Sequence, residues 1–310
     1  MEKTKFAHIV AADCKYLPEL TALLNSLDYV GNKFDLHLVG IHLPEEFSKQ
    51  LDKLDYNVIY HNIEEKEIEE SRGISEVTCR KRYYYASKYG HGYQAVNVLD
   101  ADIIFTRNPW QFFEIAAKTG FILGVSKEQN KVYDEENHKA DGKWIIPKGY
   151  YNRVDICNCP LFLDTKIWGE ALEKSWDIFL NHDFKAPDMD ALAICLIEAG
   201  AENKTILLPN VAWLGTNEKL LKPYIRVTTD RGLLKSEFGE PIFSYHGHYY
   251  HKKWRETQLD NRHRCAEGYL GCSFNTDNMA VGAMEVLYSY FKKMLNYKIK
   301  IEHKDWRHTT

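Results

Sequence analysis

Short apolar runs alternate with helical repeats over the first 60 residues of the chain. Residues 6–12 (FAHIVAA), 34–41 (FDLHLVGI) and 57–60 (NVIY) have the composition of buried strands. Apolar side chains recur at helical spacing over 17–27 and over 44–54, where a proline occupies the first turn. Strands that alternate with helices in this way predict a Rossmann-like, mostly parallel sheet flanked by helices, and therefore an α/β fold.

The same alternation continues along the chain. An apolar run at 95–99 (AVNVL) predicts a buried strand that leads directly into Asp100. Asn108 and Pro109 are typical of a helix start, and Ile115 is expected in the packing surface of that helix. Further segments predict helices at 77–89, 166–181 and 189–199, strands at 158–163, 206–208 and 242–245, and a long polar loop at 127–153.

The amino-acid composition limits which cellular environment and which binding partners we expect for this protein. A formal net charge of −4 provides no overall attraction to nucleic acid or to an anionic membrane. The seven cysteines include no CxxC pair, and neither a signal peptide nor a run of 18 apolar residues is recognised. We therefore expect reduced thiols and a cytoplasmic protein. The 20 tyrosines, 14 phenylalanines and 7 tryptophans would suit stacking on sugar rings, although composition alone favours an aromatic core.

Residues 288–310 differ from the rest in being basic and aromatic. Six lysine or arginine residues stand against two acidic ones, with Tyr290, Phe291, Tyr297 and Trp306 interleaved. Such a segment can lie on the inner membrane surface as a peripheral contact. The alternative, a charged terminal helix that packs on the domain, is the more common arrangement.

Two aspartates, Asp100 and Asp102, follow the apolar run at 95–99. The carboxyl edge of a parallel sheet is where open α/β sheets bind their ligands. Hard carboxylate oxygens suit Mg²⁺ or Mn²⁺, and such an ion can bridge a diphosphate. An Asp-x-Asp pair is common by chance, so its value here comes from the apolar residues on both sides, VNVL and IIF.

Five segments, in one order and spread over residues 6–254, resemble family 8 of the retaining GT-A glycosyltransferases. This is the group of glycogenin and of bacterial lipopolysaccharide galactosyl- and glucosyltransferases. The match is closest at LDADIIF, which is similar to the family's Leu-Asp-x-Asp between hydrophobic residues. The resemblance implies a GT-A fold in which Asp100 and Asp102 hold Mn²⁺ or Mg²⁺, so that the ion neutralises the departing diphosphate.

Two of the matching segments imply contacts with the nucleotide donor. AADCKY at 11–16 resembles the family's Ala-Ala-Asp-x-x-Tyr, which implies that Ala11 lines the donor site, Asp13 bonds the uracil and Tyr16 stacks on it. Arg82 is similar to the family's arginine near the donor sugar or its phosphates, and Arg80 competes for that role. From the residues alone, Tyr16 could instead pack locally and Arg82 could be a surface residue.

Two further matches imply residues beside the reacting sugar. Asn158 begins a segment similar to the family's Asn-Ser/Ala-Gly, although Pro160 replaces the glycine. Asp188 and Asp190 are similar to the family's Asp-Gln-Asp, which implies contacts with the donor sugar. Met189 stands where many members carry glutamine, and a thioether cannot replace that polar group. Its role would pass to Asp188 or Asp190, or the reaction would be a same-face displacement without an enzyme nucleophile; a helix cap is the structural alternative for Asp188.

The last match surrounds His246. This histidine lies six residues before Lys252, at the spacing of the family's His-x5-Lys-Pro-Trp, with Lys253 in place of the proline. The resemblance implies that His246 is the third protein ligand of the metal and that Lys252 contacts the diphosphate. His248 is an alternative ligand, and Gly247 would let the backbone approach the phosphates.

The resemblance as a whole implies a hexosyltransferase that uses a UDP-sugar and retains the anomeric configuration. Residues 1–255 would form the catalytic domain and 256–310 a helical, basic C-terminal extension that binds the acceptor or a membrane surface. The acceptor could be a glycan, a lipid, a protein or a modified base. Two other classes stay open. One is a metal-dependent nucleotidyl or phosphoryl transferase, although no Gly-rich loop follows Ala12. The other is a non-catalytic sugar-binding protein on a degenerate GT-A fold.

Overall fold

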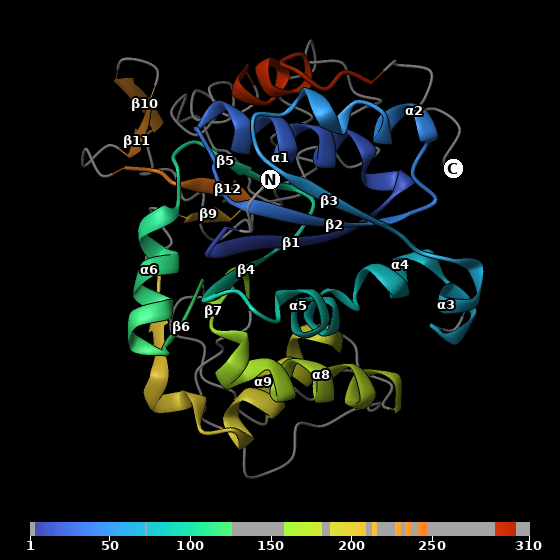
Figure 1. Ribbon diagram of the computed structural model, residues 1–310. Helices are drawn as coiled ribbons and strands as arrows, with labels where there is room; N and C mark the ends of the chain where they lie inside the picture. The colour runs from blue at the N-terminus through green and yellow to red at the C-terminus, as the bar shows by residue number, and fades with distance from the viewer. Residues whose placement is uncertain are drawn as a thin grey trace, which may run out of the picture.

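A seven-stranded, mostly parallel sheet forms the centre of the molecule (Figure 1). The computed structural model describes residues 4–71, 73–125, 158–181, 187–208, 213–215, 227–230, 233–236, 241–246 and 289–301. In spatial order the strands are β3 (Val58–Asn62), β2 (Asp35–Ile41), β1 (Phe6–Asp13), β4 (Ala95–Leu99), β7 (Asn158–Leu163), β6 (Ile122–Val125) and β8 (Thr205–Leu207). The predicted α/β class is thus confirmed.

Helices cover both faces of this sheet. β1 is parallel to β2 and β4, and β2 to β3, whereas β7 is antiparallel to β4 and β6. Helix α1 (Leu17–Tyr29) lies on one side, and α5 (Arg82–Gly90), α8 (Thr165–Asn181) and α9 (Pro187–Glu198) lie on the other (Figure 1). All of β1 is buried, as expected for a central strand between two helical layers. Other helical segments in the described part of the chain include η1 (Cys14–Tyr16), α2 (Glu45–Ser48), η2 (Leu51–Lys53), α3 (Glu65–Glu70), α4 (Ser75–Cys79), α6 (Trp110–Thr119) and η4 (Ala201–Lys204).

A smaller, three-stranded sheet begins directly after the Asp100–Asp102 motif. Its strands are β5 (Ile103–Phe105), β12 (Ser244–His246) and β9 (Trp213–Gly215), with β12 in the middle. Strands β10 (Val227–Asp230) and β11 (Leu233–Ser236) form a separate antiparallel pair. The sequence did not predict β5, β6, β9, β10 or β11, because a run of three or four residues is too short to show a period.

Several local predictions differ from the structure. Residues 44–54 form only the short segments α2 and η2, which still bury the apolar side chains that suggested one long helix. The helix predicted at 77–89 is divided, because i→i+3 hydrogen bonds at residues 77–81 tighten the chain before α5 begins at Arg82. Ile115 is 38% exposed, since the buried stripe of α6 consists of Phe112, Phe113 and Ala116. The loop expected at 127–153 lies outside the described residues.

The described part of the C-terminal stretch, residues 289–301, packs against α1 (Figure 1). The side-chain amide of the buried Asn25 donates to the carbonyl oxygens of Met294 and Ile299 at 2.7 and 2.8 Å. Its oxygen accepts the backbone N–H groups of Lys298 and Ile299 at 3.3 and 2.9 Å. We call this set of four hydrogen bonds the Asn25 clamp, and it fixes the segment to the N-terminal half of the fold.

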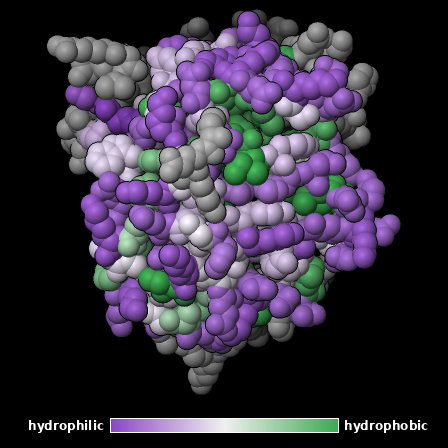
Figure 2. Space-filling model, viewed as in Figure 1, coloured by the Kyte–Doolittle hydropathy of each residue, from purple (hydrophilic) through white to green (hydrophobic). Residues whose placement is uncertain are grey.

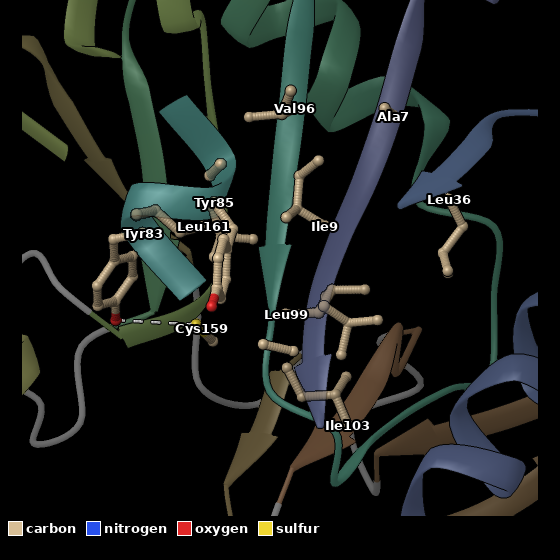
Figure 3. Close-up of a cluster of buried hydrophobic side chains, with 14 of the residues drawn as sticks. Ala7, Ile9, Leu36, Tyr83, Tyr85, Val96, Leu99, Ile103, Cys159 and Leu161 are labelled. Carbon is tan, nitrogen blue, oxygen red and sulfur yellow. Dashed lines mark hydrogen bonds between the residues drawn. The ribbon is translucent and has the colours of Figure 1, made fainter. Parts of the chain in front are cut away.

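The core is continuous between β1, β4 and α5. Figure 3 shows Ile9 of β1 near Val96 and Leu99 of β4, with Tyr83 and Tyr85 projecting from α5. All five side chains are buried. Close packing on this scale holds the ends of β1 and β4 in fixed positions, which matters because the candidate site lies there.

The surface seen in Figure 2 is mainly hydrophilic, and its apolar areas are separated from one another. Scattered apolar groups of this kind are normal for a folded domain. Within the described ranges, we find no helix with both the length and the apolar character that a membrane span requires.

Candidate active site

The carboxyl ends of β1 and β4 meet where the strand order reverses. From β1 the chain continues to β2 and β3 on one side, and β4 then lies on the other side of β1. Val10 pairs with Leu99, so Asp13 at the end of β1 and Asp100 after β4 are at the same edge of the sheet. Open α/β sheets bind ligands in the crevice at such a reversal point. Two of the segments identified in the sequence therefore meet there.

Asp13 is buried, and its carboxylate holds the turn that follows β1. Its Oδ1 accepts the backbone N–H of Lys15 at 2.9 Å, which makes Asp13 the cap of the turn η1. Tyr16, at the end of that turn, is partly buried and packs against the core, and Ala11 is buried in β1. The local packing considered for Tyr16 is therefore present, while its contact with a nucleotide base stays a prediction.

Arg82 joins two carboxylates that are far apart in the sequence. Its Nε lies 2.9 Å from Oδ1 of Asp100, and its Nη1 lies 2.6 Å from Oδ2 of Asp188. Arg80 also contacts Asp188, with Nη1 3.3 Å from Oδ1. The side chains of Arg82 and Asp188 are 12% and 6% exposed, whereas that of Asp100 is 22% exposed. Arg82 is therefore not a surface residue, and both candidate arginines reach the same aspartate in the first turn of α9.

Electrostatics keep Arg82 charged in this partly enclosed place. Burial alone would lower the pKa of Arg82, but the carboxylates of Asp100 and Asp188 outweigh burial and raise that pKa well above its ordinary value. Among the described side chains, those of Asp100, Asp188 and the buried Asp102 stand against the guanidinium groups of Arg80 and Arg82.

The first residues of β7 lie at the same edge, because β7 runs opposite to β4. The hydroxyl of Tyr83 is 3.9 Å from Sγ of Cys159 (Figure 3), and the Arg82 guanidinium carbon lies 4.7 Å from the centre of the Tyr83 ring. Burial raises the pKa of the Cys159 thiol far above its usual range, so this cysteine is a neutral packing group and not a nucleophile. Tyr83 was not predicted, since three consecutive tyrosines were its only sequence signal.

The backbone of His246 lies next to the aspartate motif. In the small sheet His246 pairs with Ile103, the residue that follows Asp102. The fold therefore places the segment that contains His246 beside the segment that contains Asp100 and Asp102. The side chain of His246 lies outside the described residues, so its role as a ligand stays a prediction.

Other predicted residues are described only in part. Asn158 begins β7 and its backbone pairs with Val125, and Asp190 is in the first turn of α9, but their side chains are not described. Gly247, Lys252 and the alternative ligand His248 lie outside the described residues altogether.

The donor atoms at this edge suit a hard divalent cation. Asp100 and Asp102 offer carboxylate oxygens, and Oδ1 of Asp100 lies 2.9 Å from Nε of Arg82. In the described ranges, no group of three or more His, Cys, Asp or Glu side chains is arranged around one point. The chemistry of the two aspartates suits such a cation, and the metal site with His246 stays a prediction.

Comparison with known proteins defines the fold. No protein-family model matches the chain, and no curated protein matches its sequence. Among solved structures, the chain is similar to the galactosyltransferase LgtC in complex with donor and acceptor sugar analogues. The TM-score is 0.57 and the identity 15%, over 97% of this chain and 99% of that one. An active-site mutant of LgtC is similar at a TM-score of 0.51 and 15% identity, over 77% of this chain and 86% of that one. The bifunctional glycosyltransferase WbbM is longer, since the chain covers 41% of it at a TM-score of 0.49.

The mostly parallel seven-stranded sheet, with helices on both faces, is the GT-A fold of glycosyltransferases. At 15% identity this likeness is one of fold. Membership of family 8 stays a prediction from the sequence.

Proposed function

We propose that the protein is a metal-dependent glycosyltransferase that moves a hexose from a UDP-sugar to an acceptor hydroxyl. One observation carries the proposal: Arg82 bridges Asp100 and Asp188 at the reversal point of a GT-A sheet. These three residues come from separate segments of the sequence, and each segment was identified independently. In the structure they are in direct contact. The similarity to a galactosyltransferase, LgtC, supports the same reaction class.

Asp100, Asp102 and His246 would hold Mn²⁺ or Mg²⁺ at this edge. When bound, the ion supplies neutralising charge for the departing diphosphate. Arg82 contacts Oδ1 of Asp100 at 2.9 Å, so its guanidinium would lie beside the bound ion and the diphosphate. Lys252 would add positive charge beside the diphosphate, and Gly247 would allow the backbone to approach it.

The uridine end of the donor would lie beyond β1, against Ala11, Asp13 and Tyr16. The cap formed by Asp13 fixes its carboxylate in one orientation, since Oδ1 already accepts the N–H of Lys15. A fixed acceptor at the edge of a planar base and an aromatic ring on its face would together select that base.

The donor sugar would lie near Asp188, with Asn158 and Asp190 as further candidates from β7 and α9. Arg80 and Arg82 both contact Asp188, and from this position its carboxylate would accept hydrogen bonds from sugar hydroxyls. Met189 is partly buried and packs against the core, which accounts for an apolar residue at this position. Retention would then proceed as a same-face displacement, in which the leaving phosphate takes the proton of the acceptor hydroxyl.

The acceptor and the membrane contact are proposals of the same kind. Residues 289–301 expose Lys292, Lys293 and Lys300 on a segment fixed to the fold, and the hydroxyl of Tyr29 accepts from Lys293 at 2.6 Å. A basic surface of this composition would suit an acceptor at an anionic membrane, or peripheral contact with that membrane.

The proposal is tested by measuring UDP release from a panel of UDP-hexoses with and without Mn²⁺. We expect metal-dependent release for at least one donor, reduced about a hundredfold or more in Asp102→Asn because one charged ligand is lost. Asp52→Asn, an exposed aspartate of η2, is the matched control and should leave release unchanged.

The two alternatives, a nucleotidyl or phosphoryl transferase and a non-catalytic sugar-binding protein, would give different results in the same experiment. Release of pyrophosphate or nucleoside monophosphate would indicate a nucleotidyl or phosphoryl transferase. Metal-independent sugar binding without turnover would indicate a binding protein. Either result would refute the proposed transfer reaction.

A further inference from the structure

Lys81, the residue directly before Arg82, has a buried ammonium group. Its side chain is 10% exposed, although lysine is among the residues that are almost never buried without a partner. Lys81 also forms the cap position at which α5 begins, and its carbonyl accepts the N–H of Tyr85 at 3.0 Å. The position of this side chain is therefore coupled to the first turn of the helix that carries Arg82.

One carboxylate and three aromatic rings surround the Lys81 ammonium. Nζ donates to Oε1 of Glu67 in α3 at 3.0 Å, and the Tyr85 hydroxyl donates to the same oxygen at 2.9 Å. The ring centres of Tyr84, Trp176 and Tyr85 lie 4.7, 5.4 and 5.7 Å from Nζ. All three distances are within the range of cation–π attraction. We call these residues the Lys81 cage.

The cage joins three separate elements of the fold. Glu67 belongs to α3, the tyrosines to α5 and Trp176 to α8. Burial by itself would raise the pKa of Glu67, but its hydrogen bonds to Lys81 and Tyr85 outweigh burial and lower that pKa. The cage thus combines an ion pair, a shared hydrogen-bond acceptor and three ring contacts, which is more than an incidental neighbour pair. A buried ion pair is often no more stabilising than apolar residues of similar volume, so stability alone does not explain it.

Arg82 needs an external constraint on its position. Its Nε and the Oδ2 of Asp188 have ion-pair partners at 2.9 and 2.6 Å but no hydrogen bond of good alignment. Charge attraction without alignment is weakly directional, so it does not by itself decide how the guanidinium divides between Asp100 and Asp188. Its Nη2 also donates to the Tyr83 hydroxyl at 3.3 Å, and both residues take their positions from the start of α5.

We propose that Lys81 is a positioning residue for the site. Its caged ammonium fixes the start of α5 and thereby holds the Arg82 guanidinium between Asp100 and Asp188. For activity, this inference rests on the proposed transfer reaction; for geometry, it depends only on the described contacts. Lys81 itself touches neither reacting atom nor predicted metal ligand, and it acts through Arg82.

The geometric part is tested by NMR of the Arg82 Nε–H group, assigned by its loss in Arg82→Lys. We expect Lys81→Met to accelerate exchange of this proton with water about tenfold or more, because the guanidinium leaves its fixed place. Lys88→Met is the matched control, since Lys88 is an exposed lysine on the same helix that lies over the Tyr89 ring. Unchanged Arg82 exchange in folded Lys81→Met would overturn the inference.

Two further variants keep the test decisive if Lys81→Met does not fold. Lys81→Arg retains the cation and should preserve slow exchange of the Arg82 proton. Glu67→Gln removes the charge of the cage but keeps an acceptor, and it should accelerate that exchange. The opposite pattern in these two variants would contradict a positioning role.

The functional part is tested with a double-mutant cycle on donor turnover. We expect Lys81→Met to lower kcat/KM about tenfold to a hundredfold in the presence of Arg82, which is the usual effect of a displaced site residue. In an Arg82→Gln background the same substitution should have almost no further effect. Additive effects would show that Lys81 acts independently of Arg82. A wild type that does not turn over any donor refutes the proposed function alone, because the NMR measurement still decides the positioning claim.

Discussion

The Asn25 clamp allows a quantitative prediction about the C-terminal segment. Asn25→Ala removes all four hydrogen bonds between this fully buried side chain and residues 294–299. At about 0.5–1.5 kcal/mol for each bond, with the deserted carbonyl and N–H groups left in a buried place, we expect a loss of about 3–5 kcal/mol. Such a loss is a large part of the stability of an ordinary domain.

The loss should first appear as local opening of the segment. Hydrogen exchange of the amides at 289–301 should accelerate by about two to four orders of magnitude, while exchange in β1 and β4 changes less. Urea unfolding then measures how much of the loss reaches the whole fold. Asn296→Ala is the control, because Asn296 is an exposed asparagine of the same segment whose amide donates only to the carbonyl of Lys292. If Asn25→Ala and Asn296→Ala give equal exchange and unfolding midpoints, the energetic role of the clamp is wrong.

Two further predictions concern the core. Burial lowers the pKa of His8 to about 3, so the folded protein keeps this histidine neutral. The unfolded chain binds a proton at this histidine below its pKa of about 6.5, so the free energy of unfolding decreases as the pH falls below that value. Acidification from pH 7 to pH 5.5 should therefore cost about 1 kcal/mol through His8, and urea titrations of His8→Leu should lack that part of the pH dependence. Gly90→Ala would place a methyl group 2.8 Å from side-chain carbons of both Thr165 and Val96, and it should lower the free energy of unfolding by about 1–3 kcal/mol. In Gly169→Ala the nearest atom is a serine hydroxyl at 3.3 Å, so a cost as large as that of Gly90→Ala would contradict the packing argument.

The central sheet could be predicted from the sequence because its first four strands are apolar runs with helices between them. The run AVNVL corresponds to β4 residue for residue, and the helix over 17–27 corresponds to most of α1. The division of the helix predicted at 77–89 was missed, since residues 77–81 keep helical spacing in the sequence and the i→i+3 hydrogen bonds there leave no local signal.

In the candidate site, too, the sequence predicted individual residues but not the contacts between them. The family resemblance pointed to Asp100, Arg82 and Asp188 separately, but no local pattern shows that one guanidinium contacts both carboxylates. Arg80 and Arg82 competed in the sequence for a single role, whereas the structure gives each a contact with Asp188. The strand β12 is three residues long, so its pairing with β5 beside Asp102 depends on long-range contacts that a sequence window does not contain.

The attachment of residues 289–301 has a consequence for biosynthesis. The carbonyl oxygen of Phe105 in β5 accepts a hydrogen bond from the Tyr290 hydroxyl at 2.9 Å. The Asn25 side chain donates to the carbonyl oxygen of Met294, which is 269 positions later in the chain. While the ribosome is still translating the intervening residues, α1 and β5 carry polar groups whose final partners do not yet exist. The nascent N-terminal half must therefore remain hydrated or chaperone-bound at these points, and the completed fold forms only after this distant stretch leaves the exit tunnel.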